Sequence, residues 1–199
     1  MIRGSVVDES GNPVAGADVW YPAKLIPERY RRHTLHAESD EQGRFELEYP
    51  AARLAEERPT ALFYSIWAHK SGRCVGTCSA YKALRAKEKA PEVQIVLGPE
   101  TDASFSVVAP DGEPVAGAVV EPFHYQVGHY DLFPPELAPR LRATTDADGR
   151  AALPAVARDR LGSVSVTSKE FGVQHVDIHG GRAVPAEFTI PLQPVGRIE

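Results

Sequence analysis

Two short phrases occur twice in this chain, in the same order, and this duplication constrains the fold more than any other feature. Residues 5–19 (SVVDESGNPVAGADV) return as residues 106–120 (SVVAPDGEPVAGAVV). Residues 39–47 (SDEQGRFEL) return as residues 145–153 (TDADGRAAL). Because the order and nearly the spacing are kept, the repeat unit is a whole domain of about 100 residues. An array of such units usually presents a surface or spans a distance.

The repeat places one module at residues 1–99 and a second at residues 100–195. In the first copy Leu97 is followed six positions later by Ala103, where the first strand of the second copy is expected to begin. In the second copy Leu192 is likewise followed six positions later by Ile198. Ile198-Glu199 also matches Ile2-Arg3. We therefore expect residues 196–199 to begin a third repeat, the alternative being an ordinary polar tail. Function is then expected to lie partly outside these 199 residues.

Composition and charge exclude several classes of partner. The chain is 43% hydrophobic and 25% charged, which suits a globular protein rather than a disordered one. Residues 1–99 carry 14 Lys/Arg and 13 Asp/Glu (net +1), and residues 100–199 carry 8 and 14 (net −6), which sum to −5. Neither half is basic enough to follow a phosphate backbone, so we expect no nucleic-acid partner. No apolar run approaches the roughly 20 residues that span a membrane, so we expect no membrane insertion by this segment.

The hydrophobic pattern predicts an all-β chain with little helix. Short β-branched or aromatic runs, several of them alternating with period two, are separated by turn signals rich in Gly, Pro and Asp. These runs are residues 5–7, 17–21, 44–49, 62–68 and 93–97 in the first copy, and 105–108, 118–120, 164–167, 173–178 and 188–192 in the second. Short helical turns are expected at residues 51–58, 81–89 and 135–137.

The recurring phrases have structural roles. Asp40 and Asp146 each precede a glycine by three residues, so each carboxylate is placed to accept backbone N–H groups in an Asx-type turn. Gly43 and Gly149 then supply the positive φ that such a turn requires. A calcium loop at residues 146–149 is excluded because the later ligands of an EF-hand, including its bidentate Glu, are absent.

With both phrases in view, the chain resembles the carboxypeptidase regulatory-like domain. The pattern Gly-x-Pro-Val-x-Gly-Ala-x-Val occurs at residues 11–19 and 112–120, and each copy is followed by Asp-x-x-Gly-Arg, at residues 40–44 and 146–150. The resemblance implies an all-β fold of two tandem prealbumin-like β-sandwich modules, of about seven strands each. Such domains are commonly strung together in bacterial exported or membrane-attached proteins.

Three enzyme or crosslinking relatives of this fold can be compared residue by residue. Asn12 is the sole asparagine and lies in a turn, which excludes a Lys–Asn isopeptide bond. The Tyr-Arg-Gly-Ser motif of hydroxyisourate hydrolases is absent. Intradiol dioxygenases bind iron through two Tyr and two His, and the second copy offers a set of candidates without that family's ligand spacing: His124, Tyr125, His129, Tyr130, His175 and His179. We therefore expect no enzyme and no cofactor.

The two copies differ most between the phrases, where each carries a long connection rich in aromatic residues, proline and histidine. Long loops on a rigid sandwich are where binding usually occurs, and aromatic rings suit a sugar or a peptide. The candidate ligand-binding residues are Trp20, Tyr21, Tyr30, His124, Tyr125, His129 and Tyr130. The alternative is that these connections fold over the end of the sandwich or fill the space between modules.

Two smaller features are ambiguous. His175, Asp177 and His179 alternate with Val176 and Ile178, which predicts a solvated strand face and leaves a partial metal site as the alternative. Cys74 and Cys78 are too far apart on a straight strand for a disulfide, and a lone pair is weak evidence for zinc. We expect two half-buried thiols.

The sequence therefore predicts a non-enzymatic structural, spacer or binding module of a larger bacterial protein. Its partners would be neighbouring repeats, with a glycan or a peptide as a further possibility. The resemblance implies a periplasmic, cell-surface or secreted location, with any export signal either removed or lying upstream. The alternatives are a carbohydrate- or peptide-binding module that uses the connections, and a metal-dependent enzyme of the dioxygenase type.

Overall fold

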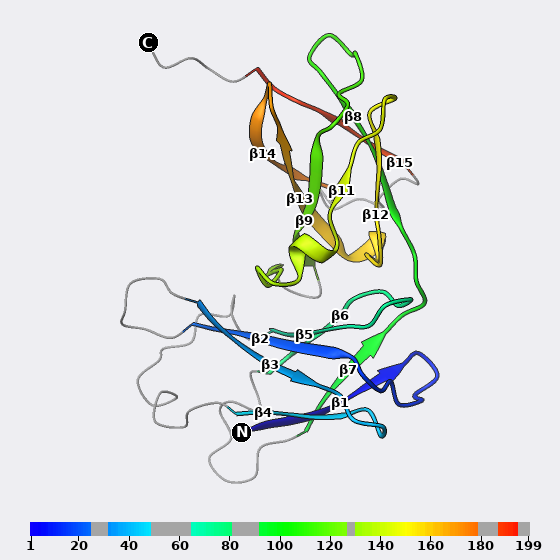
Figure 1. Cartoon of the computed structure of the whole chain (residues 1–199), viewed down its shortest axis with the longest axis vertical. Helices are drawn as coiled ribbons and strands as arrows, with labels where there is room; N and C mark the ends of the chain where they lie inside the picture. The colour runs from blue at the N-terminus through cyan, green and yellow to red at the C-terminus, as the bar shows by residue number, and fades with distance from the viewer. Residues whose placement is uncertain (25–31, 49–64, 81–91, 127–129, 179–186, 195–199) are drawn as a thin grey trace. The chain divides into compact units, whose positions relative to one another are not determined.

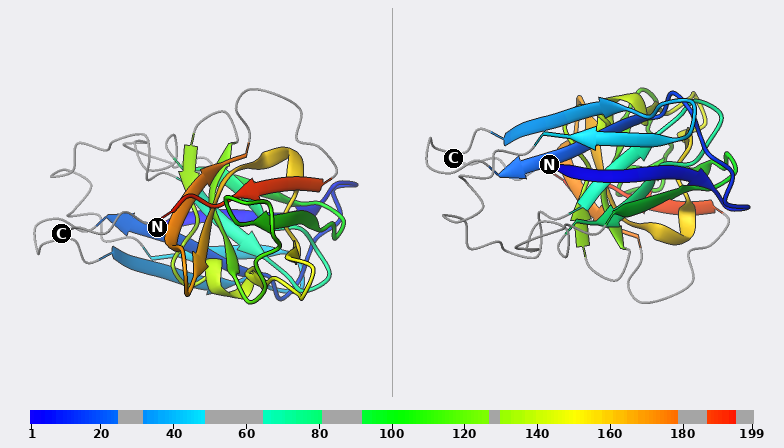
Figure 2. Two further views of the ribbon diagram at one scale, coloured as in Figure 1. Left: turned by 90° about the horizontal axis from the view of Figure 1, so that it is seen from above. Right: turned by 90° about the horizontal axis from the view of Figure 1, so that it is seen from below.

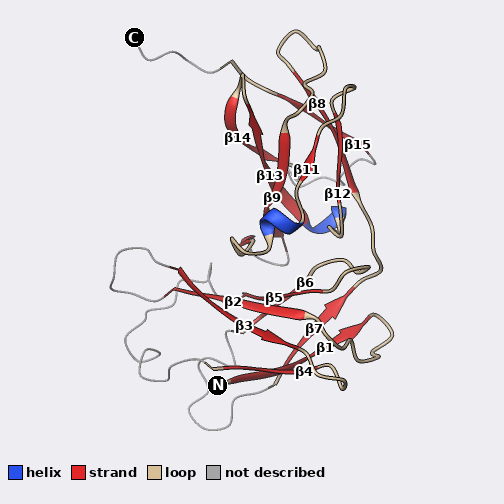
Figure 3. Cartoon of the chain, in the orientation of Figure 1, coloured by secondary structure: helices blue, strands red, loops and turns tan. Residues whose placement is uncertain are grey.

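The structure is a computed structural model that describes residues 1–24, 32–48, 65–80, 92–126, 130–178 and 187–194. The chain divides into two units, Met1–Pro99 and Glu100–Glu199. In the described residues of both units the regular secondary structure is strand, apart from two short 3₁₀ turns (Figures 1 and 3). The fold class expected from the sequence, two tandem β-sandwich modules, is confirmed.

The described residues of the first unit form seven strands in two sheets. One sheet has the order β4-β1-β7 and the other the order β3-β2-β5-β6. β1 lies between an antiparallel neighbour, β4, and a parallel neighbour, β7. The strands are β1 (Ile2–Asp8), β2 (Asp18–Lys24), β3 (Arg32–Glu38), β4 (Arg44–Leu47), β5 (Ser65–His69), β6 (Gly76–Ser79) and β7 (Val93–Leu97).

The second unit repeats this arrangement. The order β12-β8-β15 reproduces the smaller sheet, again with a parallel last strand, and the larger sheet has the order β10-β9-β13-β14 with β11 beside β9. Figure 2 gives two further views of the strands. The strands are β8 (Ala103–Val108), β9 (Val119–Gln126), β10 (Tyr130–Leu132), β11 (Ala143–Thr144), β12 (Arg150–Leu153), β13 (Leu161–Ser168), β14 (Gly172–Asp177) and β15 (Glu187–Pro191).

Each core forms between the two sheets from the inward side chains of alternating strands. β4 and β12 share the pattern exposed, buried, exposed, buried, as expected for a strand with one face on a core. In the first unit Val6, Leu47 and Ile95 from the smaller sheet pack in one cluster with Tyr21 and Ile66 from the larger one. Burial of such side chains contributes about 1.5–3 kcal/mol each.

Each core contains a phenylalanine ring at one pair of facing residues, but the two units place this ring on different strands of the pair. In the first unit Gly4 of β1 lies opposite Phe45 of β4, whereas in the second Phe105 of β8 lies opposite Ala151 of β12. A Cβ on Gly4 would lie 2.7 Å from Cζ of Phe45 and 2.4 Å from the carbonyl oxygen of Val93. The small residue is therefore required wherever its partner carries the ring.

The Asx turns predicted for the second phrase are present in both units. Oδ1 of Asp40 accepts the N–H groups of Gln42 and Arg44, at 2.9 and 2.8 Å. Oδ1 of Asp146 does the same for the residues two and four positions on, at 3.0 and 2.9 Å. Gly43 and Gly149 both have φ of 72°, which glycine adopts without steric cost.

A buried hydroxyl joins the two phrases in each unit, and the sequence reasoning missed it. Oγ of Ser39 accepts the N–H of Ala17 at 2.8 Å and donates to the carbonyl of Val14 at 2.7 Å. Oγ1 of Thr145 makes the two equivalent bonds in the second unit, at 2.8 and 2.6 Å. The signal was available, because a hydroxyl residue precedes the aspartate of the second phrase in both copies.

The long connections expected between the two phrases are wrong in large part, because strand structure continues beyond the predicted runs at residues 17–21 and 118–120. β2 pairs with β3 from Asp18↔Glu38 to Lys24↔Arg32. β9 likewise runs to Gln126 and pairs with β10. Each segment contains a proline, a residue that is unfavourable in the middle of a sheet, and the sequence therefore looked unlike a strand. Pro22 is opposite Thr34 of β3 but lies beyond the part of β2 that pairs with β5, and Pro122 lies beside a register shift against β13. Strands tolerate proline at such unpaired or irregular positions.

The minor helix expected from the sequence is placed only in part. The predicted turn at residues 135–137 leads into a 3₁₀ turn at Ala138–Arg140, and a second, unpredicted one lies at Arg158–Arg160. The predictions at residues 51–58 and 81–89, and the third repeat expected at residues 196–199, fall outside the described residues. Within the described residues, no helix is long and apolar enough to cross a membrane.

Candidate functional site

Two of the seven residues proposed for ligand binding are used inside the modules. Tyr21 is 3% exposed and belongs to the core of the first unit. Tyr125 is fully buried, its hydroxyl accepts the N–H of Ala157 at 2.8 Å, and its ring meets Phe133 edge-on with centroids 4.8 Å apart. Neither ring presents a face to a ligand.

Trp20 lies on the opposite face of the larger sheet. Its neighbours Val19 and Tyr21 are core residues, so strand alternation turns Trp20 outward. There it is directly opposite Trp67 of β5. On the other side of Trp20, the ring of His36 lies 5.6 Å away between centroids. Trp20 and Trp67 are only 3% and 0% exposed, so they present no open stacking surface.

The remaining candidates are placed to different degrees. Tyr30 and His129 lie outside the described residues, and Tyr130 is placed through its backbone, opposite Gln126 in the β9–β10 pair. His124 is half-buried on the outer face of the larger sheet, where its Nδ1 is hydrogen bonded to Oγ of Ser163 at 2.8 Å.

Burial lowers the pKa of His124 below its ordinary value, and nearby His175 lowers it further, while the carboxylate of Asp177 opposes the shift. The neutral imidazole is therefore the favoured form of His124 in the folded unit at neutral pH. A neutral ring can accept or donate one hydrogen bond at Nδ1, which suits its contact with the serine hydroxyl.

The described candidates do not converge on one point. His124 faces outward and Tyr125 inward, so these two side chains of the proposed iron set are on opposite faces of one sheet. His175 and Asp177 are exposed on the outer face, and His179 is outside the described residues. Among the described residues, no group of three or more His, Cys, Asp or Glu could hold a metal ion.

Cys74 and Cys78 are not joined in a disulfide; Cys74 is buried and Cys78 is partly buried. Cys74 lies before β6, its N–H bonded to the carbonyl of Gly98 at 3.1 Å, and Cys78 is within β6, opposite Ile66. Cys74 is enclosed at 3% exposure, which removes it from contact with solvent oxidants or metals.

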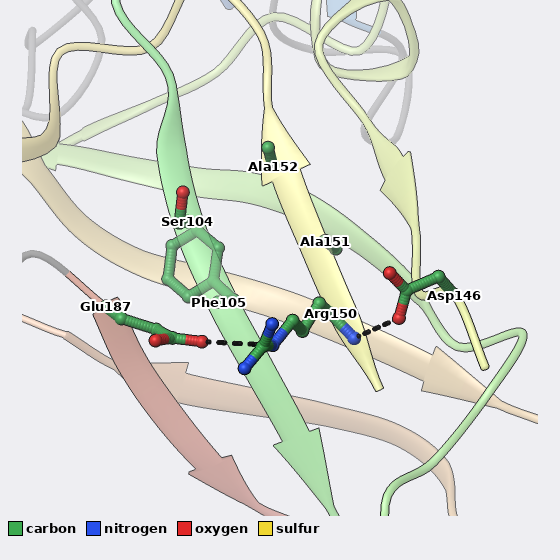
Figure 4. A pocket seen from close by; sticks show the side chains of 7 residues that line it. All are labelled: Ser104, Phe105, Asp146, Arg150, Ala151, Ala152 and Glu187. Atoms are coloured by element: carbon green, nitrogen blue, oxygen red, sulfur yellow. Dashed lines mark hydrogen bonds and ion pairs between the residues drawn. The ribbon is translucent and has the colours of Figure 1, made fainter. Parts of the chain in front are cut away.

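The second unit also has a broad, open hollow on the outer face of its smaller sheet, which the sequence reasoning missed (Figure 4). Its volume is about 520 Å³, and it is lined by Ser104, Phe105, Asp146, Arg150, Ala151, Ala152 and Glu187. Nε of Arg150 lies 3.7 Å from Oε1 of Glu187, which also accepts the hydroxyl of Ser106 at 2.7 Å.

The hollow exists because the second copy has small side chains where the first has large ones. At the positions of Ser104 and Ala152, the first unit carries Arg3 and Glu46, which form an ion pair at 2.7 Å. Aligning the two copies by their recurring phrases would have revealed this difference. In the second unit the polar groups of the hollow bond mainly to one another, as Figure 4 shows for Arg150 with Glu187 and Asp146.

Comparison with known proteins adds little to this description. No protein-family model matches the chain, and no curated protein sequence is significantly similar to it. Among solved structures, it is similar to a streptococcal ancillary pilin, with 14% identity and a TM-score of 0.31 over 98% of this chain and 62% of that one.

Two further similar structures are also pilus proteins. The shaft pilin SpaA from Lactobacillus rhamnosus GG is 12% identical, with a TM-score of 0.30 over 100% of this chain and 98% of that one. The full-length RrgB pilus protein from Streptococcus pneumoniae is 8% identical, with a TM-score of 0.29 over 100% and 47%. The chain thus spans less than two thirds of the ancillary pilin and of RrgB, and its fold assignment rests on the sheets described above.

Proposed function

We propose that this chain is a non-enzymatic structural segment: two β-sandwich modules of the carboxypeptidase regulatory-like type that act as spacer units in a larger, exported or surface-attached protein. The observation that carries the proposal is the pairing of the first and last strands of each unit. β1 is parallel to β7 and β8 is parallel to β15. Because two adjacent strands run in the same direction, the chain enters each sandwich at one end and leaves it at the opposite end.

This topology suits a spacer for two reasons. Each unit adds its full strand length to the distance spanned by the chain. A pulling force applied through the ends of a unit also loads the parallel pair in shear, so the inter-strand hydrogen bonds must break together rather than one after another. The pairs extend over five residues in each unit, from Gly4↔Val93 to Asp8↔Leu97 and from Glu187↔Ser104 to Pro191↔Val108.

The use of the aromatic residues supports the same proposal. Tyr21 and Tyr125 contribute to the interiors of the modules rather than to a binding surface. The Asx turn and the buried hydroxyl of the first unit are both repeated in the second. Neighbouring repeats of the parent protein are then the expected partners. The dioxygenase alternative is disfavoured because His124 and Tyr125 point to opposite faces of their sheet.

Single-molecule stretching of the chain by its two ends tests the spacer function. We expect two unfolding events, each releasing roughly 330 Å of chain, at about 3.3 Å for each of the about 100 residues in a unit. The control attaches the handle at the β1–β2 turn, at Gly11→Cys, so that β1 is peeled from β7 rather than sheared. A force that does not fall in this geometry contradicts the proposal.

A further inference from the structure

The outer face of the larger sheet in the second unit carries a group of polar and aromatic side chains. Val120, Val164 and Val166 are fully buried, so their neighbours in β9, β13 and β14 point to the opposite face. The register arranges these outward residues in three rows: Val119, Thr167 and Val173; Glu121, Ser165 and His175; His124, Ser163 and Asp177. The middle strand contributes hydroxyl side chains, while rings and carboxylates stand on the strands beside it.

A β-bulge adds one more ring to this face. His124 lies opposite Ser163 and Pro122 lies opposite Val164, so Phe123 between them has no partner of its own on β13. The ring of Phe123 lies 4.5 Å from that of His124 and 4.3 Å from that of His175, between centroids. All three rings therefore share the outer face. Bulges commonly redirect a side chain toward a functional site.

The ring cluster, defined as Phe123, His124 and His175, is held in place and open to solvent. His175 is exposed, while Phe123 and His124 are half-buried. The hydrogen bond between Ser163 and His124 fixes the orientation of the His124 ring, because Ser163 is itself only 2% exposed. A ligand can thus meet ring faces that lose little freedom on binding.

The charge around the ring cluster is negative. Asp177 is exposed beside it, and the side chain of Glu121 is 32% exposed in the adjacent row. Residues 100–199 carry 14 Asp/Glu against 8 Lys/Arg, so the field of the whole unit attracts cations. The imidazole of His124 is favoured in its neutral form and does not cancel these carboxylates.

From this arrangement we infer that the ring cluster, with Glu121 and Asp177, is a binding site for arginine side chains of an extended peptide. A guanidinium is planar and weakly hydrated, so it stacks on aromatic rings, and its forked N–H groups pair with carboxylates. The rings and the two carboxylates of this face supply both kinds of contact. The hydroxyls of Ser165 and Thr167 offer hydrogen bonds to the adjoining peptide backbone.

The chain already shows a guanidinium approaching this face. Nη1 of Arg142 lies 4.0 Å from Oε1 of Glu121, with 59% of the Arg142 side chain exposed. An exposed pair at this distance is weak, so a ligand can compete with it. Arg142 reaches Glu121 from one side and leaves Asp177 to an incoming group.

The same face of the first unit is different. The row Glu121, Ser165 and His175 corresponds to Trp20, Trp67 and Thr77, whose two tryptophans are buried. The core positions of the two sheets are alike, with Val19 matching Val120, whereas the outward positions differ. The arginine site is therefore assigned to the second unit.

The test is a titration of the whole chain, labelled at its histidine rings, with the peptide acetyl-Gly-Arg-Gly-Arg-Gly-amide at pH 7.5 and low salt. NMR signals of His124 and His175 are assigned with His124→Gln and His175→Gln. We expect these two signals to shift and saturate with a dissociation constant of about 1 mM, while the other five histidines stay unchanged. The citrulline version of the peptide, which has the same shape without charge, should not bind.

Two matched variants distinguish peptide binding at the ring cluster from a general electrostatic attraction of the peptide to the acidic unit. Asp177→Asn should weaken binding at least about 5-fold, whereas Glu113→Gln, the same charge loss on an exposed turn of the same unit, should change it less than about 2-fold. Equal weakening by both variants, equal binding of a lysine peptide, or unshifted histidine signals would each overturn the proposal. So would shifts of these signals by a chito- or malto-oligosaccharide in place of the arginine peptide.

Discussion

At the scale of single residues, the buried hydroxyl that joins the two phrases carries a testable share of stability. Replacing Ser39 by Ala leaves the N–H of Ala17 and the carbonyl of Val14 without their partner in a site where Ser39 is 4% exposed. Leaving a buried polar group unsatisfied costs about 1–3 kcal/mol. We expect Ser39→Ala to lower the free energy of unfolding of the first unit by that amount.

Tryptophan fluorescence during urea unfolding measures this loss, because both tryptophans belong to the first unit. The control is Ser39→Thr, which keeps the oxygen and copies the residue found at Thr145 in the second unit. A midpoint that is equally low for both variants would show that steric fit, rather than the hydroxyl, stabilises this position.

His124 gives a pH-dependent prediction. Burial lowers the pKa of His124 in the folded unit below its ordinary value of 6.5, so the unfolded chain takes up the proton more readily. The contribution of His124 to stability is therefore present above about pH 6.5 and lost as the pH falls below it. The groups that face the ring among the described residues include Phe123, Ser163, His175 and Asp177.

We expect the melting temperature of the chain to fall between pH 7.5 and 5.5, and to fall less in His124→Gln, which keeps a polar group toward Ser163. The matched control is His36→Gln on the first unit, whose exposed ring is paired with Asp18 at 2.7 Å. An unchanged pH slope in His124→Gln would contradict the assignment.

Residues that act locally were predictable, and residues that act across the fold were not. The Asx turns at Asp40 and Asp146 were read correctly because a carboxylate and a glycine three residues later form one local motif. The hydroxyl of Ser39 bonds to residues 22 and 25 positions away, and sequence spacing alone does not reveal that proximity. His124 was selected as a candidate, but its partner Ser163 is 39 positions distant.

At the scale of strands, the phenylalanine ring lies on β4 in the first unit and on β8 in the second. We therefore expect the effects of substitutions at the two facing positions on stability to be strongly coupled. Phe105→Gly should destabilise the second unit by about 3–5 kcal/mol, since the buried ring of Phe105 is 1% exposed and leaves a cavity. Adding Ala151→Phe copies the arrangement of Gly4 and Phe45 in the first unit. We expect the double variant to recover at least about half of the loss.

Circular dichroism melts of the two single variants and the double variant give the coupling energy as a double-mutant cycle. Ala151→Phe alone should destabilise the unit because it crowds the ring of Phe105. A double variant less stable than Phe105→Gly would mean that the two cores are not interchangeable at this pair.

The strands themselves were predicted where period-two alternation is clean and missed where proline interrupts it. β1, β7, β8 and β15 were found within a few residues. β3 was not among the predicted strand runs, and its sequence mixes histidine and threonine with apolar residues. Pairing with β2 overrides that weak local signal.

At the scale of the whole molecule, the duplicated phrases were enough to predict the architecture, and not enough to predict a site. Aromatic residues between the two phrases were assigned to long connections, which favour binding, although Trp20 and Tyr21 also belonged to the predicted strand at residues 17–21. Once those segments are strands, alternation sends Tyr21 and Tyr125 inward and Trp20 and His124 outward. The face that a side chain occupies follows from register, which a single sequence does not specify.

The two units should fold independently when separated at Pro99. Every strand pair in the described residues joins strands of one unit, and each unit has its own two sheets and buried hydroxyl. At about 100 residues, each is large enough to form its own core. We expect residues 1–99 and 100–199, expressed separately, each to show a cooperative melt and a dispersed NMR spectrum.

A fragment that ends inside the first unit is the control for the fragments that end at the boundary between the units. Residues 1–72 lack β6 and β7, so β1 loses its parallel neighbour and the larger sheet loses an edge strand. This fragment should remain unfolded, because Ile95 and Leu97 no longer complete the core. If residues 1–99 were unfolded in isolation and folded only in the full chain, the second unit would be a stabilising partner, and the description of the array as a string of independent spacers would have to be abandoned.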